Sequence, residues 1–558
     1  MAIAWQIGNT TIRNPYRIKD GLKALKESGL AGEKAGQEWD RRYRDELIKT
    51  GLLKATQSSD ESNSAGRKWR SAFEKLGFIF PVVKKNEEPI GGTAWTLTPT
   101  GIQLIQSNDA IVLEDLFTRA LTAPVYGGLE KDTFFSPLFW VISVLNELAL
   151  LGEKQYIGFG EFKSIVQTTC PPNFSACEVA KKIQEIRKKT IKEKTLIKSV
   201  LGIDIEETSL RSLQDYADMN LRYLKATGLF VNYSHGITPN PLKLGVFERF
   251  LEEQQYFISD FRQNKTNQCF GFPMFYDNLD EAKKLYIAQV KQAGIQGISY
   301  VIPFDIKTVS KDVIKKEYDR LYLKCFEQKE QQFALDQANK WQEISQYMEI
   351  LIKGQKKETN GLRIPSDMKP AYFEWIIWRS ILAIDSLVNS PEQVRKFKID
   401  ADFLPIFTAP GGTADLVAEF KDYRLAVEVT LSESSRQEAM EGEPVRRHVA
   451  DLCQKRDIPT FGLFLARKVH TNTAETFRHG LWYYDDDSPV DLKIVPFSLE
   501  EFKNLFDWLF ENKIENKAQK LRILLESCLQ GKDSLTAPEW KKTMKETIKN
   551  QILVSNSL

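Results

Sequence analysis

Polar and apolar residues alternate along two short segments in the last third of the chain. The pattern predicts strands at 415–420 (D-L-V-A-E-F) and 423–431 (Y-R-L-A-V-E-V-T-L), joined by a polar turn at Lys421-Asp422. Along the second segment one face is apolar and the other carries a carboxylate, with Leu425, Val427 and Val429 alternating with Ala426, Glu428 and Thr430. We therefore expect a β-hairpin with one apolar face and one face that carries the acid.

Each predicted strand carries one carboxylate, Asp415 and Glu428. If the turn has two residues, Phe420 faces Tyr423 and Asp415 faces Glu428, with Cβ atoms about 4.5–5.5 Å apart. Two acids at that distance repel each other unless they share a proton or hold a cation, which makes the pair a candidate Mg²⁺ site. Two alternatives stay open. Because Lys-Asp is a weak hairpin dipeptide, a four-residue loop would instead set Asp415 opposite Thr430, with Glu428 still on the same face. Both acids would be ordinary surface residues if the hairpin were exposed.

Further helices and strands surround this hairpin. A strongly apolar helix opens with P-A-Y-F-E-W-I-I-W at 370–378 and continues to about Leu387. Glu374 within it is costly to bury unless it is paired or bound to a metal, although a first-turn acid is also favoured by the helix dipole. A second helix is expected to start with Pro444 in its first turn and to reach Lys455, with Glu441 and Glu443 just before it. Buried strands at 460–466 and 492–497 and a capping box at 498–501 follow, which together predict a mixed sheet between helices.

The first 255 residues contain a rough internal echo. Helical stretches at 67–76 and 221–226 each lead into a glycine and an apolar strand, then a polar turn, a second strand and a Thr-Pro that opens a helix. This order is typical of a winged helix-turn-helix, in which the helix enters a DNA groove and the wing contacts phosphates.

Basic residues occur where such modules would contact phosphates. They interleave with aromatic residues or form a run at 181–198, and the candidate DNA-binding residues are Arg41, Arg42, Arg44, Arg67, Lys68, Arg70, Lys188 and Lys189. The alternative for each group is a solvated helix face.

Composition narrows the class of protein. The chain has 558 residues, of which 42% are hydrophobic and 11% aromatic, as in folded globular proteins. Its formal charge of +2 neither indicates nor excludes a nucleic-acid partner. Six scattered cysteines and four histidines argue against a zinc site and for reduced thiols, so we expect a cytoplasmic protein. The first residues show no basic region followed by an apolar core, so we expect no export signal. The apolar run at 138–145, with Ser136 as N-cap and Pro137 in the first turn, is too short to cross a membrane.

We therefore expect a multidomain α+β protein. The predicted division is a mainly helical recognition half with winged-helix-like subdomains at 1–130 and 131–255, a helical linker at 256–355, and a C-terminal α/β domain at 356–558 with a central mixed sheet.

The acidic motifs resemble those of a known family. F-E-W at 373–375, a Gly-rich loop before Asp415, E-V-T at 428–430 and E-G-E-P-V-R-R-H at 441–448 are similar to the cleavage domain of the AlwI-type restriction endonucleases, a branch of the PD-(D/E)XK nucleases. The order of the parts is also similar across most of the chain. Members of this family bind a short asymmetric sequence in double-stranded DNA and cut a few base pairs to one side.

The resemblance implies roles for individual residues. Glu374, Asp415, Glu428 and Glu441 match the acidic active-site residues, and Arg447 and His448 match the R-H pair. Asp415, Glu428, the Val429 carbonyl and Glu374 would hold Mg²⁺, Glu441 could act as a base or outer ligand, and Arg447 and His448 could contact a phosphate or the leaving group. Two positions depart from the superfamily pattern. Ala414 replaces the proline before the aspartate, and Thr430 replaces the lysine two residues after the glutamate.

Three outcomes remain open for the activity. A second copy could associate transiently through the cleavage domain and give a double-strand break, or the enzyme could nick one strand. The chain could instead be a winged-helix DNA-binding protein whose nuclease domain has degenerated.

Overall fold

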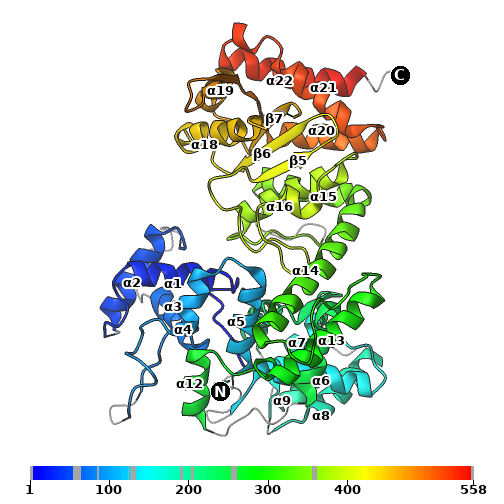
Figure 1. The fold of residues 1–558 in the computed structure, drawn as a ribbon. Coiled ribbons are helices and arrows are strands. Elements are labelled where there is room, and N and C mark those ends of the chain that lie inside the picture. The colour runs from blue at the N-terminus through cyan, green and yellow to red at the C-terminus, as the bar shows by residue number, and fades with distance from the viewer. Residues whose placement is uncertain are drawn as a thin grey trace. The chain divides into compact units, whose positions relative to one another are not determined.

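The computed structural model describes residues 4–34, 36–53, 64–83, 87–123, 125–126, 134–171, 173–188, 193–202, 206–252, 260–354, 361–455 and 457–554. The chain forms two compact units, one of Met1–Cys325 with Asp400–Asp402 and one of Phe326–Ile399 with Phe403–Leu558. Figure 1 shows the sheet of the second unit among the labelled helices α15, α16, α18 and α20. The finer division into four domains stays a prediction.

The first unit is mainly helical. Helix α10 (Glu207–Lys225) leads into the antiparallel hairpin of β3 (Phe230–Tyr233) and β4 (Gly236–Pro239), and α11 (Leu244–Glu252) follows. A single bridge between Ile79 and Leu97 joins the corresponding segments between α3 and α4. Both copies therefore have the expected order of helix, paired strands and helix, and their winged-helix geometry stays a prediction. The prediction that Thr-Pro opens a helix is confirmed at Pro99 but is wrong in the second copy, where Thr238 and Pro239 pair with Val231 and Phe230 as the end of β4. The other elements that begin in this unit are α1 (Arg17–Glu27), α2 (Gln37–Lys49), α3 (Ser64–Lys75), α4 (Pro99–Gln106), α5 (Ala110–Thr122), β1 (Val125–Tyr126), β2 (Phe134–Phe135), α6 (Pro137–Leu150), α7 (Phe159–Ser164), α8 (Ala176–Lys188), α9 (Glu193–Leu201), α12 (Phe261–Phe270), α13 (Leu279–Ile295) and α14 (Lys311–Leu335).

A mixed four-stranded sheet forms the centre of the second unit. The strand order is β10-β7-β6-β5, with β6, β7 and β10 parallel to one another and β5 antiparallel to β6. Together with the surrounding helices this gives the expected α+β architecture, while the assignment to the PD-(D/E)XK fold stays a prediction. The elements are α15 (Trp341–Lys353), α16 (Lys369–Ala383), α17 (Pro391–Val394), β5 (Leu416–Glu419), β6 (Arg424–Thr430), α18 (Arg436–Cys453), β7 (Thr460–Ala466), α19 (Thr471–Arg478), β8 (Leu481–Tyr483), β9 (Pro489–Asp491), β10 (Lys493–Ser498), α20 (Leu499–Glu511), α21 (Lys517–Leu529) and α22 (Ala537–Val554).

The hairpin of β5 and β6 has the register of a two-residue turn. Glu419 pairs with Arg424, and the Phe420 N–H donates to the Tyr423 carbonyl at 2.9 Å. Counting outward through Leu416 and Val427, this register sets Asp415 opposite Glu428. The four-residue alternative is therefore excluded, and both acids lie on the face that the alternation predicted.

Helix α18 begins earlier than the sequence predicted. It starts at Arg436, so Pro444 lies inside the helix and not in its first turn, and Glu441 and Glu443 are helical residues. The physical reason is a tertiary anchor near the helix start. The buried Gln437 amide donates to the carbonyls of Ser432 and Lys468 and accepts from the His470 N–H. These bonds hold the helix in place although proline interrupts its own hydrogen-bond ladder.

Other local predictions are confirmed. Ser136 caps α6 with Pro137 in its first turn, and Ser498 and Glu501 form the capping box of α20. Helix α16 is buried along its length from Ala371 to Ala383. Within the described residues, no helix is long and apolar enough to cross a membrane.

Candidate active site

Asp415 lies directly before β5 and is bonded to the neighbouring strand. Its Oδ2 accepts a hydrogen bond from the Val429 N–H at 2.9 Å. Burial raises the pKa of this carboxyl well above its usual value, and the charges of Glu428 and Glu441 raise it further. The negative charges of neighbouring acids therefore act on Asp415.

Glu374 contributes a second acid from α16. Its side chain is only 5% exposed, and its Oε2 accepts from the Ala409 N–H at 2.6 Å. Burial, together with the charges of Asp415 and Glu428, raises the pKa of Glu374 to about 9. A carboxyl in this position favours its neutral form unless a cation is near.

Glu441 contributes from α18. Burial raises its pKa, the charge of Glu428 adds to the rise, and a hydrogen bond from Thr430 opposes it. Since Glu374 and Asp415 interact with Glu428 as well, the four predicted acids form one electrostatic cluster drawn from α16, the β5–β6 hairpin and α18.

His448 binds one of these acids directly. Its Nδ1 lies 2.6 Å from Oε1 of Glu428, and both side chains are buried. The other ring nitrogen, Nε2, is buried and has no hydrogen-bond partner among the described residues. Because Glu441 and His448 are seven residues apart, two helical turns set them on the same face of α18. This alignment depends on the continuous helix through Pro444.

Arg447 lies elsewhere on α18. It is half-buried and its Nε donates to Glu443, one turn earlier, at 3.0 Å. The structure therefore brings His448, but not Arg447, into hydrogen-bond contact with the acid cluster.

The candidate DNA-binding residues of the first unit occupy varied environments. Arg41 pairs with Glu38 at 2.6 Å and Arg42 with Glu33 at 2.6 Å, whereas Arg67 and Lys188 are exposed. Arg44 pairs with Asp45, and Lys68 is half-buried. Arg70 pairs with Asp40 and lies over the rings of Trp39 and Trp95. Lys189 lies outside the described residues. The DNA-binding role of all these residues stays a prediction.

The acid cluster suits a hard divalent cation by its chemistry. Carboxylate oxygens are the ligands that Mg²⁺ prefers, and mutual repulsion among the acids is what such an ion would relieve. In the described part of the chain, however, no three His, Cys, Asp or Glu side chains are gathered at metal-binding distance. Glu374, Asp415 and Glu428 each direct one oxygen to a separate donor, namely Ala409 N, Val429 N and His448 Nδ1. The donor types therefore fit the ion, and the Asp415 and Glu428 carboxyls are close enough to share a hydrogen bond, although each of the three acids also has a separate donor.

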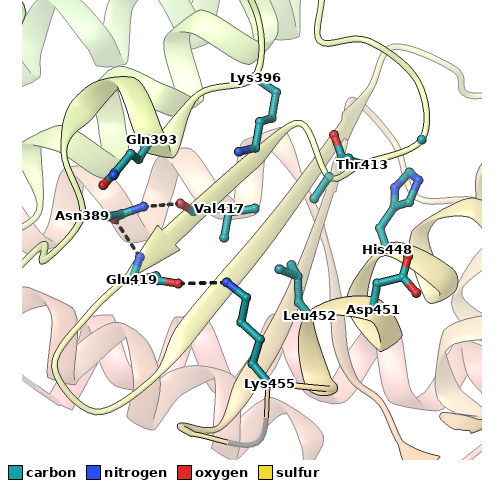
Figure 2. A pocket seen from close by; sticks show the side chains of 12 residues that line it. Asn389, Gln393, Lys396, Thr413, Val417, Glu419, His448, Asp451, Leu452 and Lys455 are labelled. Atoms are coloured by element: carbon teal, nitrogen blue, oxygen red, sulfur yellow. Dashed lines mark hydrogen bonds and ion pairs between the residues drawn. The ribbon is translucent and has the colours of Figure 1, made fainter. Parts of the chain in front are cut away.

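A pocket of about 410 Å³ adjoins the cluster. It is bounded by Gly412 to Ala414, directly before Asp415, and by His448 on α18. Figure 2 shows Thr413 and His448 at one end of the pocket, and Lys396 and Lys455 reaching it from different elements. None of the four acids lines this pocket, which meets the cluster through Ala414, next to Asp415, and through His448, which is bonded to Glu428.

Comparison with protein families decides the identity of the chain. The model of the AlwI restriction endonuclease family matches residues 74–505, which include every acid of the cluster and His448. The chain belongs to the AlwI restriction endonuclease family. Membership of this family makes the molecule a restriction endonuclease, and confirms the resemblance seen in the motifs.

Two solved structures are similar to this AlwI-family chain only in part. One is the small subunit (R.BspD6I2) of the heterodimeric restriction endonuclease R.BspD6I, at 23% identity, covering 38% of this chain and 98% of that one with a TM-score of 0.30. The other is the BpuJ1 endonuclease binding domain in complex with modified DNA, at 10% identity, covering 43% of this chain and 90% of that one with a TM-score of 0.29. No curated protein matches the chain.

Several contacts of the AlwI-family site were not expected from the sequence. The Ala409 N–H holds Glu374, the Thr430 hydroxyl holds Glu441, and Lys396 lines the adjoining pocket. Ala409 lies directly before the Gly-rich loop and Lys396 lies in the irregular segment after α17, and no local pattern marks either of them. Thr430 stood out only as the residue in place of a lysine.

Proposed function

We propose that this restriction endonuclease binds a short asymmetric sequence in double-stranded DNA and hydrolyses phosphodiester bonds a few base pairs outside it, with Mg²⁺ as cofactor. The observation that carries the proposal is the mutual electrostatic coupling of Glu374, Asp415, Glu428 and Glu441. Family membership supports DNA as the substrate, and the separation of the chain into two units fits a division between recognition and cleavage.

Asp415, Glu428, Glu374 and the Val429 carbonyl would hold Mg²⁺. Such an ion, when bound, lowers the pKa of water and stabilises negative charge on the scissile phosphate. Ionised acids are needed for this role, so the raised pKa values of Glu374 and Asp415 describe the metal-free protein.

Side chains of the protein would carry out the other steps of hydrolysis. His448 orients Glu428 through its Nδ1 bond. Glu441 is suited to accept a proton from water, because its raised pKa brings it closer to the working pH than an ordinary glutamate. Nε2 of His448, which is buried and unpartnered among the described residues, could donate to a phosphate oxygen in the imidazolium form, in which both ring nitrogens carry a proton.

A strand-specific nicking activity is the second candidate. One such cluster would cut one strand at a time, so a double-strand break would need a second copy that associates through the cleavage domain. The further alternative, a non-catalytic DNA-binding protein, is disfavoured. Burying several repelling acids costs stability, and a chain without catalysis gains nothing from them.

A plasmid assay tests the proposal. Supercoiled plasmid incubated with the protein should be converted to nicked or linear products in Mg²⁺ and remain intact in EDTA. Sequencing the new ends would give the recognition site, the offset and the strand. Equal cutting with and without Mg²⁺, or no cutting on plasmids of varied sequence, would contradict it.

Substitutions connect the assay to the cluster. Asp415→Asn and Glu428→Gln should abolish cutting and leave sequence-specific binding intact. Asp422→Asn, which changes an exposed acid at the turn of the same hairpin, is the matched control and should cut normally. Full cutting by both site variants would show that the cluster is not the active site.

A further inference from the structure

The pocket beside the acids continues along the same face of the sheet. Residues two apart on a strand point to the same side, so Val417 and Glu419 follow Asp415 along one face of β5. Val417 and Glu419 both line the pocket, as do Thr413 and Ala414 on the other side of Asp415. The pocket is therefore the extension of the acid cluster along β5.

Lys396 is fixed beside Asp415 by the backbone. Its N–H donates to the Asp415 carbonyl at 3.2 Å, and the preceding residue, Arg395, bridges to Leu416. The Lys396 side chain is half-buried in the pocket wall and makes no hydrogen bond or ion pair with the described residues. This contrasts with Lys455 across the pocket, whose Nζ lies 3.7 Å from Glu419. Figure 2 marks that ion pair and shows none for Lys396.

The superfamily pattern has a lysine two residues after the glutamate, and this chain has a threonine there. Thr430 stands there and is hydrogen-bonded to Glu441. The acid cluster consequently lacks a cation at this position of β6, while Lys396, next to β5, brings an unpaired positive charge to the adjoining pocket.

The acids that line the pocket do not neutralise Lys396. Glu419 is bonded to Arg424 at 2.9 Å in addition to its contact with Lys455. Asp451 is exposed, so its charge is screened by water and salt. A pocket of about 410 Å³ is of the size that takes a small ligand or one nucleotide.

We propose that this pocket holds the DNA strand on one side of the scissile phosphate, and that Lys396 binds a phosphate oxygen of that strand. The inference rests on the proposed function and adds a substrate-binding residue to it. Lys396 fixes the position of the strand along β5, so that the scissile phosphate meets Asp415 and Glu428.

The first experiment compares Lys396→Ala, Lys396→Arg and the control Lys398→Ala, which removes an exposed lysine two residues further on. Lys396→Ala should lower kcat/KM for a duplex containing the site by tenfold or more, with normal thermal unfolding, and arginine should restore part of the loss. Removing one phosphate contact should also lower the salt slope of log Kd by about 0.9. Lys398→Ala should cut within twofold of the parent. Wild-type kcat/KM and salt slope in Lys396→Ala would overturn the assignment, as would an equal loss in Lys398→Ala.

The second experiment does not depend on cleavage. Thymidine 3′,5′-bisphosphate is titrated by calorimetry in EDTA into the full chain and its variants. The parent and Lys398→Ala should bind it, and Lys396→Ala should bind it at least tenfold more weakly. If the parent cuts no DNA but this dependence on Lys396 appears, the proposed function fails and the phosphate site stands. Equal binding by all three proteins would refute the site even if the parent cuts.

Discussion

Nδ1 of His448 lies 2.6 Å from Oε1 of Glu428, and both side chains are buried. This bond connects α18 to the acidic face of the hairpin, and gives the histidine of the R-H pair a structural explanation. His448 orients an acid of the cluster, whereas its neighbour Arg447 is bonded to Glu443.

Replacing His448 by alanine should therefore impair catalysis more than binding. Glu428 loses the donor that orients it, and loss of such a supporting contact typically costs about 10–100-fold in metal affinity or activity. We expect kcat to fall by that amount while Kd for site-containing DNA in EDTA is unchanged. His479→Ala, which removes an exposed histidine bonded to Glu475, is the control. An unchanged kcat in His448→Ala would rule out that His448 orients Glu428 for catalysis.

Glu374→Gln should stabilise the metal-free protein in a pH-dependent way. The folded-state pKa of Glu374 is raised to about 9, so folding favours its neutral form. The stability associated with this group is present below the unfolded pKa of about 4.5 and is lost as pH rises toward 9. Glutamine keeps the acceptor for the Ala409 N–H and carries no charge. In EDTA, denaturant unfolding should show a gain of roughly 1–3 kcal/mol at pH 8 and a smaller gain at pH 5.

Glu392→Gln, on the exposed side of α17, should show no such difference between the two pH values. A gain for Glu374→Gln that is the same at pH 5 and pH 8 would show that ionisation of Glu374 is not its source.

Thr430→Val should shift the pH dependence of cleavage. The Thr430 hydrogen bond lowers the pKa of Glu441 against the effects of burial and of Glu428. Removing the hydroxyl raises that pKa, so the acidic limb of the pH–rate profile should move to higher pH if Glu441 acts as the base. A profile with the same acidic limb as the parent would exclude that role for Glu441.

Two ion pairs of the second unit should differ widely in their effect on stability. Arg395 and Glu330 are almost fully buried and are joined at 2.7 Å, whereas the side chains of Arg447 and Glu443 are 39% and 61% exposed. Glu330→Ala leaves an uncompensated buried charge and should cost about 3–5 kcal/mol of unfolding free energy. Glu443→Ala should change it by less than about 1 kcal/mol. If both variants lose the same free energy of unfolding in urea, the buried pair does not stabilise the fold more than the exposed one.

Only the part of the acid cluster that lies on the hairpin could be predicted from local sequence pattern. The alternation along 423–431 placed Glu428 on the acidic face in either register, but the sequence left two turn lengths open, and only the strand pairing sets Asp415 opposite Glu428. The start of α18 could not be predicted, because Gln437 is anchored by Lys468 and His470, which are distant in sequence. The same holds for the Ala409 N–H and for Lys396, whose roles arise only when separate segments meet.

The central claim is that Glu374, Asp415 and Glu428 hold one divalent ion and that Glu441 acts beside it. It is tested most directly by counting bound Mn²⁺, as a spectroscopic substitute for Mg²⁺, by electron paramagnetic resonance with the protein on site-containing DNA. The parent and Asp422→Asn should bind the ion, Mg²⁺ should displace it, and Asp415→Asn and Glu428→Gln should lose that binding. The same number and affinity of Mn²⁺ ions in all four proteins would contradict the account.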